Sequence, residues 1–157
     1  MNAWMLLGLV FAVAIGMVLP MQALINARLA ELTSGPLFAS FLSFLVGTLA
    51  LGAMLLVNRG ESGLRSPLEM PWWVWTGGFI GALFVFATTL LVPRLGAASM
   101  ICLVVLGQVV GSLLLDHYGV LHAPRPADAV RVAGALLVVV GATFAVLPVA
   151  LRAVAFD

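Results

Sequence analysis

Three polar side chains interrupt the apolar stretch LVVLGQVVGSLLLDHYG, which runs from residue 103 to residue 119. They are Gln108, Ser112 and Asp116, each four residues from the next. On a helix this spacing places all three on one face, with Gln108 and Asp116 about 12 Å apart along the axis. An amide near the middle of a membrane span needs a hydrogen-bond partner, because no water solvates it there. Two interpretations stay open: Gln108 is a staple between helices, or it lines a hydrated substrate path.

A second polar pair lies in the first apolar segment, where Gln22 and Asn26 are one helical turn apart, just past Pro20. Proline removes a backbone donor and bends a helix, which leaves a nearby carbonyl group free. Interrupted helices of transporters expose such groups to a central cavity. We therefore predict that Gln22 and Asn26 converge with Gln108 and Ser112 on one substrate path. The alternative is that Asn26 marks the end of its helix at the lipid headgroups.

The usual signatures of catalysis and of cofactor binding are missing from the sequence. No His–Glu pair has metal-ligand spacing, no glycine-rich loop could hold a phosphate, and no serine is framed by glycines with a matching acid and base. His117 and His122 share a predicted loop with Asp116, where a metal would face solvent and lack ligands. We expect no catalytic residue, no metal and no cofactor. Cys102 is expected to be a small buried apolar side chain.

Composition indicates what kind of protein positions these groups. The chain has 157 residues, of which 64% are hydrophobic and 8% are charged, and its mean hydropathy is +1.22. Soluble domains carry about 25% charged residues, so a soluble globular protein is excluded. A net charge of +1 gives no basic field for nucleic acid. The expected partners are membrane lipid, a small-molecule substrate and another transmembrane chain.

Five segments are long enough to cross a bilayer, which takes about 20 apolar residues. We predict an all-α integral membrane protein with a single five-helix transmembrane domain over residues 1–157, its spans lying at about 4–27, 36–57, 72–92, 96–115 and 128–150. The first segment is too long, and too uncharged at its start, for a cleaved signal peptide. Thr33 or Ser34 is a candidate N-cap of the second span. Residues 93–96 are expected to form a tight corner, and residues 116–128 the last loop.

The arginines specify the orientation of the chain only weakly. Five spans place the two termini on opposite sides of the membrane, with four arginines on one side and three on the other: Arg59, Arg65, Arg125 and Arg131 against Arg28, Arg94 and Arg152. Orientation follows the excess of Lys and Arg in cytoplasmic loops, and here the excess is one. Either the chain has one weakly specified orientation, or it inserts both ways. Arg28 and Glu31, three residues apart, are expected to mark the end of the first span at the headgroups.

Small residues recur every four positions in several spans, a pattern that lets helix backbones approach closely in lipid. Ala12, Ala39 and Ser43 take part in these repeats, and the predicted helix-packing glycines are Gly8, Gly16, Gly47, Gly77, Gly81, Gly107 and Gly111. Two interpretations remain open. These positions form packing faces inside one monomer, or some of them form a dimer seam, for which the fourth and fifth spans are the best candidates.

Two stretches carry a resemblance to a known family: MQALINARLAELTSGPLFASFLSFLVGTLAL and PRLGAASMICLVVLGQVVGSLLLDHYG. On these, the chain resembles the short, five-helix YdcZ-like family of the drug/metabolite transporter superfamily over nearly its full length. The second stretch is the more specific, because a Pro-Arg-x-Gly corner, a Gly-Gln pair and an Asp-His-aromatic-Gly ending fall together. The residues that carry the resemblance are Gln22, Asn26, Pro36, Ser43, Phe44, Gly47, Pro93, Arg94, Gly96, Gly107, Gln108, Asp116 and Gly119.

The resemblance implies a protein of the cytoplasmic (inner) membrane, built like half of a ten-helix transporter with a 5+5 inverted repeat. One chain would supply both halves by pairing antiparallel with itself, as a homodimer of dual topology, or with a sister five-helix chain. The four-helix multidrug members of the superfamily couple protons through a glutamate in their first helix, whereas no span interior here holds an acid. For proton coupling the well-placed acid is Asp116, with His117 second. Asp116 is expected to act in gating or in charge balance with Arg94 or Arg131.

The predicted function is therefore that of a small-molecule transporter subunit that works by alternating access as an antiparallel dimer. The alternative from a different class is a non-transporting membrane scaffold or accessory subunit, whose polar residues lock helices together. An enzyme acting on lipid-linked substrates is a remote third. A hydrated cavity that reaches Gln108 favours transport, and a dry, tightly packed centre favours the scaffold.

Overall fold

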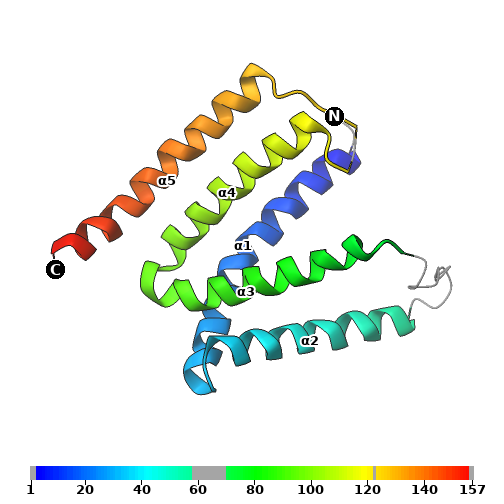
Figure 1. The fold of residues 1–157 in the computed structure, drawn as a ribbon, viewed down its shortest axis with the longest axis vertical. Coiled ribbons are helices and arrows are strands. Elements are labelled where there is room, and N and C mark those ends of the chain that lie inside the picture. The colour runs from blue at the N-terminus through cyan, green and yellow to red at the C-terminus, as the bar shows by residue number, and fades with distance from the viewer. Residues whose placement is uncertain (1–2, 58–69, 122, 156–157) are drawn as a thin grey trace. The chain divides into compact units, whose positions relative to one another are not determined.

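The computed structural model describes residues 3–57, 70–121 and 123–155, and the regular structure in these residues is helical. In chain order the elements are α1 (Ala3–Leu32), α2 (Pro36–Val57), the 3-10 turn η2 (Trp72–Trp75), α3 (Thr76–Leu95), α4 (Ala97–Tyr118) and α5 (Ala129–Ala155) (Figure 1). Within the described residues five helices are long and apolar enough to cross a membrane, which confirms the predicted all-α, five-span class. The chain divides into two compact units, unit 1 (residues 1–93) and unit 2 (residues 94–157). The single five-helix domain remains a prediction.

Unit 1 is built on a hairpin of α1 and α2. The tight connection requires Gly35, because its φ of +105° lies in the left-handed region that favours glycine. Pro36 then opens α2, at a position where the missing N–H breaks no helix bond. The buried side chains of Ala23, Ala27 and Ala39 are small, which lets helix backbones approach closely.

Neither predicted N-cap residue caps α2. The hydroxyl of Thr33 donates to the carbonyl oxygen of Leu29 at 2.7 Å, so this side chain completes the last turn of α1. Ser34 makes no side-chain hydrogen bond within the described residues, and the first turn of α2 closes through the amide of Ala39, which donates to the carbonyl of Gly35 at 3.1 Å. The prediction was wrong because a hydroxyl at the end of a helix can bond backwards as readily as forwards.

Four helices run further than predicted, and one of them is α5, which ends at Ala155 instead of about residue 150. Arg28 and Glu31 lie inside α1 and pair with each other at its exposed end. Pro93 and Arg94 lie in the last turn of α3, so the predicted corner narrows to Gly96, which has a φ of +77°. The fourth helix extends to Tyr118, and Asp116 and His117 are therefore helical residues instead of loop residues. The predicted loop positions of Arg59, Arg65 and His122 lie outside the described residues.

Unit 2 is a hairpin of α4 and α5. The hydroxyl of Ser99 on α4 donates to the carbonyl oxygen of Ala145 on α5 at 3.1 Å. Ala135 and Ala142 on α5 are buried. The fifth helix begins with a side-chain cap, because the Asp128 carboxylate accepts the backbone N–H of Arg131 at 2.8 Å.

The turn after α4 is a Schellman motif centred on Gly119. The amide of Val120 donates to the carbonyl of Leu115 at 3.0 Å, and the amide of Gly119 donates to that of Asp116 at 3.2 Å. Gly119 has a φ of +66°, and a Cβ atom built there would lie 2.6 Å from the Cγ of Pro124. Both the backbone conformation and the space therefore require glycine at this position.

Candidate substrate path

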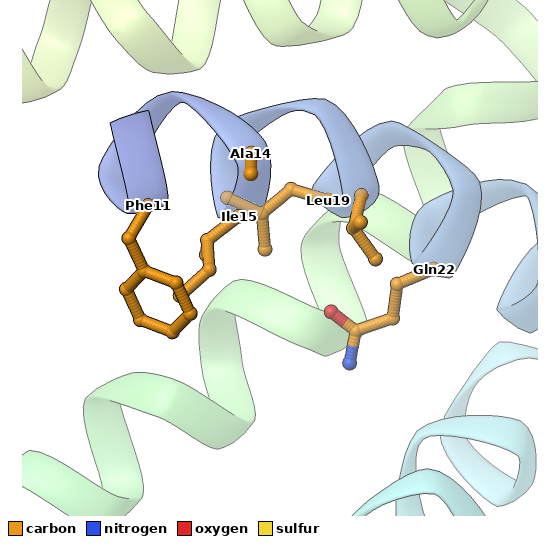
Figure 2. Close-up of a pocket in the computed structure, with 6 residues that line it drawn as sticks. Phe11, Ala14, Ile15, Leu19 and Gln22 are labelled. Atoms are coloured by element: carbon orange, nitrogen blue, oxygen red, sulfur yellow. The ribbon is translucent and has the colours of Figure 1, made fainter. Parts of the chain in front are cut away.

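An open groove of about 480 Å³ lies along one face of α1. Figure 2 shows the side chains of Phe11, Ile15 and Leu19 on this face, with Gln22 at the end of the row. The lining residues are Phe11, Ala14, Ile15, Val18, Leu19 and Gln22. Their spacing follows the helical repeat, so the groove is apolar for about three turns of α1 and ends at the amide of Gln22. Such a surface suits a molecule with an apolar body and one hydrogen-bonding group.

Asn26 follows Gln22 by one turn on α1, but its surroundings are different. The Asn26 residue is 4% exposed, whereas Gln22 is exposed. Within the described residues the Asn26 amide makes no hydrogen bond to the protein. Asn26 is thus a buried group, unlike the exposed ion pair of Arg28 and Glu31 that follows it.

In unit 2 the predicted path residues lie on the exposed side of α4. Gln108 and Ser112 are exposed, and the Ser112 hydroxyl donates back to the carbonyl of Val109 at 3.0 Å. The Gln108 amide makes no hydrogen bond within the described residues. Inside unit 2 the bond between α4 and α5 comes from Ser99, so Gln108 is not needed to hold this hairpin together.

The structure brings Gln22 and Asn26 together on one face of α1 and Gln108 and Ser112 together on one face of α4. The first pair belongs to unit 1 and the second to unit 2. Their convergence on one path remains a prediction.

Asp116, the predicted gating or charge-balance acid, faces Arg131 across the α4–α5 turn. Its Oδ2 lies 3.7 Å from the Nη1 of Arg131, and the Nε of Arg131 lies 3.7 Å from the Oδ2 of Asp128. The side chains of Arg131 and Asp116 are 45% and 36% exposed, and ion pairs as exposed as this contribute about 0–1 kcal/mol. Arg94 is exposed and makes no ion pair within the described part of the chain. Of the two arginines proposed as partners, Arg131 is the one that lies close to the acid.

The backbone and the histidine of this turn add further contacts. The carbonyl of Asp116 accepts the amide of Arg125 at 2.8 Å, and Nδ1 of His117 accepts the amide of Ala127 at 3.4 Å. Among the described residues, which exclude His122, no group of three His, Cys, Asp or Glu side chains could hold a metal ion. Cys102 is half-buried in α4.

One predicted packing glycine has a neighbour in its own unit. A Cβ atom built on Gly81 of α3 would lie 3.6 Å from the ring of Phe44 on α2. At the other six predicted positions, a built Cβ would meet no atom within 4 Å in the described residues: Gly8, Gly16, Gly47, Gly77, Gly107 and Gly111. Close packing at these six glycines remains a prediction. In the described residues of their own units, no other atom packs against them.

Comparison with known proteins assigns the chain to a family. A family model described as "Putative inner membrane exporter, YdcZ" matches residues 7–144. The chain is 33% identical over 137 residues to the inner membrane protein YdcZ of Escherichia coli (strain K12), which covers 87% of this chain and 92% of the relative. The chain belongs to the YdcZ family. No solved structure matches it.

Membership of the YdcZ family confirms the resemblance drawn from the sequence. With five helices that can span a membrane, this YdcZ family member is a multi-pass protein of the inner membrane. The family is described as an exporter, not as an enzyme. The matched range contains every predicted path and gating residue, from Gln22 to Asp116.

Sequence reasoning missed several buried polar residues of this YdcZ family member. Beside Asn26, the buried polar side chains are Ser40, Thr88, Thr89 and Ser99. Serine and threonine are nearly neutral on hydropathy scales and are common in spans, so composition does not single them out. The adjacent threonines Thr88 and Thr89 of α3 were the available signal. Neighbouring positions on a helix face different directions, so two adjacent hydroxyls have different surroundings.

Proposed function

We propose that this chain is one subunit of a small-molecule exporter, in which two five-helix subunits of opposite orientation work by alternating access. The observation that supports transport best is the polar end of the α1 groove, where an apolar face leads to Gln22, one turn before the buried residue Asn26. In a scaffold, a buried amide is expected to bond to a neighbouring helix, because an unmet polar group in lipid costs free energy. The Asn26 side chain makes no such bond in the described residues, and its amide is not among the fully enclosed polar atoms, so a solute could reach it.

The odd number of spans and the distribution of arginines support an antiparallel pair. Five spans correspond to one half of a 5+5 arrangement. The predicted loops hold four arginines on one side of the membrane and three on the other, which does not favour one orientation strongly. Gly107 and Gly111 on α4 leave space that nothing in their own unit fills. A second copy, or a sister five-helix chain, would fill it.

A topology reporter fused to the C-terminus tests the self-paired arrangement. Comparable signals from both sides of the membrane are the expected result, and two arginines added after Arg59 should shift nearly all chains to one orientation. A single orientation in the unaltered chain would rule out pairing with itself and would require a sister chain.

Cross-linking tests whether α4 forms the seam. Gly111→Leu should weaken dimer cross-linking, because the larger side chain forces the backbones apart. Gly52→Leu is the matched control, since a Cβ at Gly52 also meets no atom within 4 Å and Gly52 is outside the predicted packing positions. Equal cross-linking in both variants would show that the α4 face meets lipid.

A further inference from the structure

Thr88 and Thr89 are neighbours on α3, and both are buried, with 4% and 1% of their surfaces exposed. The hydroxyl of Thr88 donates to the carbonyl of Val85 at 3.0 Å, the usual way in which a helix satisfies a buried hydroxyl. Ser40, on α2, does the same through the carbonyl of Pro36 at 2.7 Å. The hydroxyl of Thr89 has no hydrogen-bond partner in the described residues.

The backbone beside this hydroxyl is also short of a donor. In an α-helix the carbonyl of residue 89 accepts the N–H of residue 93, and residue 93 is a proline inside α3. Thr89 thus presents an unused hydroxyl next to a carbonyl that lacks its regular helical partner. A buried polar group without a partner raises the free energy of the conformation that contains it, and few proteins keep one without a functional reason.

Asn26 is also a buried residue of unit 1 whose side chain makes no hydrogen bond in the described residues, but its amide atoms, unlike the Thr89 hydroxyl, are not fully enclosed. A hydroxyl and a carboxamide both donate and accept hydrogen bonds, and neither carries charge. Within the part of unit 1 that the structure describes, no ionisable side chain is among the buried residues, which are Ala23, Asn26, Ala27, Ala39, Ser40, Thr88, Thr89 and Val92. An ion placed among these residues would have no counter-charge, which makes its burial very costly.

We infer that Thr89 and Asn26 are recognition groups of unit 1 for an uncharged solute that has an apolar body and a terminal hydrogen-bonding group. The inference rests on the proposed exporter function and names its substrate class. The apolar body suits the row of Phe11, Ile15 and Leu19 on α1. Because the Thr89 hydroxyl is fully enclosed in the conformation described, its bond to the solute forms when unit 1 opens.

The first experiment compares the two threonines by thermal unfolding of the purified protein in detergent. Thr89→Val removes a polar group without a partner, so its Tm should equal or exceed that of the unaltered chain. Thr88→Val removes a satisfied hydroxyl at the same depth, and its Tm should fall. A Tm for Thr89→Val that falls as far as that of Thr88→Val would overturn the inference, because it would show that Thr89 has a structural partner.

The second experiment tests the solute class, with benzamide and substituted benzamides as neutral probes and the matching benzylammonium ions as cationic probes. The benzamides should raise the Tm of the unaltered chain and of Thr88→Val, and this shift should be lost in Thr89→Val and Asn26→Leu. Stabilisation by the cations, or by neither series, overturns the inference. Neither experiment measures transport, so a chain that binds benzamides but moves nothing across a vesicle membrane would contradict the proposed function alone.

Discussion

The two units treat their buried polar groups differently. Among the described residues of unit 2 the buried polar side chain is Ser99, and its hydroxyl donates to the carbonyl of Ala145 on the neighbouring helix. In unit 1 the buried hydroxyls of Ser40 and Thr88 bond back within their own helices, whereas the enclosed hydroxyl of Thr89 has no partner in the described residues. The difference does not come from composition, because both units place a few polar residues on long apolar helices.

This contrast separates two uses of polarity in a membrane. A hydrogen bond between helices in lipid contributes about 0.6–2 kcal/mol, so a polar residue that bonds to a neighbouring helix stabilises the packing of the two helices. A polar residue without a partner destabilises the fold, and it is retained where it acts on a ligand or in another conformation. The Ser99 hydroxyl of unit 2 is of the first kind, and the Thr89 hydroxyl of unit 1 is of the second.

The largest loss of stability is expected from Gly119→Ala in the turn of unit 2. The left-handed φ alone costs about 1–3 kcal/mol for a residue with a side chain, and the contact with Pro124 adds to this. Folded yield and Tm in detergent measure the effect, with Gly107→Ala as the control at an open helical position. If the two variants are equally stable, the α4–α5 turn does not hold unit 2 together.

Ser99→Ala should cost about 0.5–1.5 kcal/mol, the net value of one hydrogen bond. Ser112→Ala is its control, because that hydroxyl is exposed and bonds only within its own helix. Thermal unfolding should place Ser99→Ala below the unaltered chain and Ser112→Ala close to it. A Ser99→Ala variant as stable as the unaltered chain would remove the distinction drawn between the units.

Asp116→Asn should change stability by about 0–1 kcal/mol, because the pair with Arg131 is partly exposed to solvent. A double-mutant cycle with Arg131→Gln isolates the contribution of the pair, which should shrink in 1 M salt (Debye length about 3 Å). A coupling that salt leaves unchanged would show that the pair is buried in the assembled protein. If Asp116 gates transport, Asn at this position should slow export more than it weakens binding.

Gln108→Leu should leave the Tm unchanged, because the Gln108 amide makes no hydrogen bond in the described residues, and it should abolish export. Export is measured as the inhibitory concentration of a compound panel for cells that produce the variant or the unaltered chain. Gln108→Glu offers a second variant of similar size, in which a charge at midspan tests whether the site tolerates an ion. A large fall in the Tm of Gln108→Leu would identify Gln108 as a staple and favour the scaffold.

The spans were predictable because each needs about 20 apolar residues, and the sequence contains five such blocks. The ends of the helices were less predictable. The bonds that Thr33 and Asp116 make depend on which way each side chain turns at a helix terminus, and hydropathy carries no information about that. Thr89 was missed for a related reason: the rotation of α3 decides which of two adjacent threonines lacks a partner, and rotation is a property of tertiary packing. The amides Gln22, Asn26 and Gln108 could be singled out from the sequence because amides are rare at membrane depth, and their place on a substrate path, with Ser112 beside Gln108, stays a prediction.

The α4–α5 turn also bears on how the protein is made. Its Schellman bonds, the Asp128 cap and the Asp116–Arg131 pair all join residues fewer than twenty apart in the chain. Contacts this local form quickly and need nothing from the earlier helices. We therefore expect the hairpin to close during translation, soon after α5 leaves the ribosome, and to close in the same way on either side of the membrane. A chain inserted in either direction would then present the same folded α4–α5 hairpin to its partner subunit.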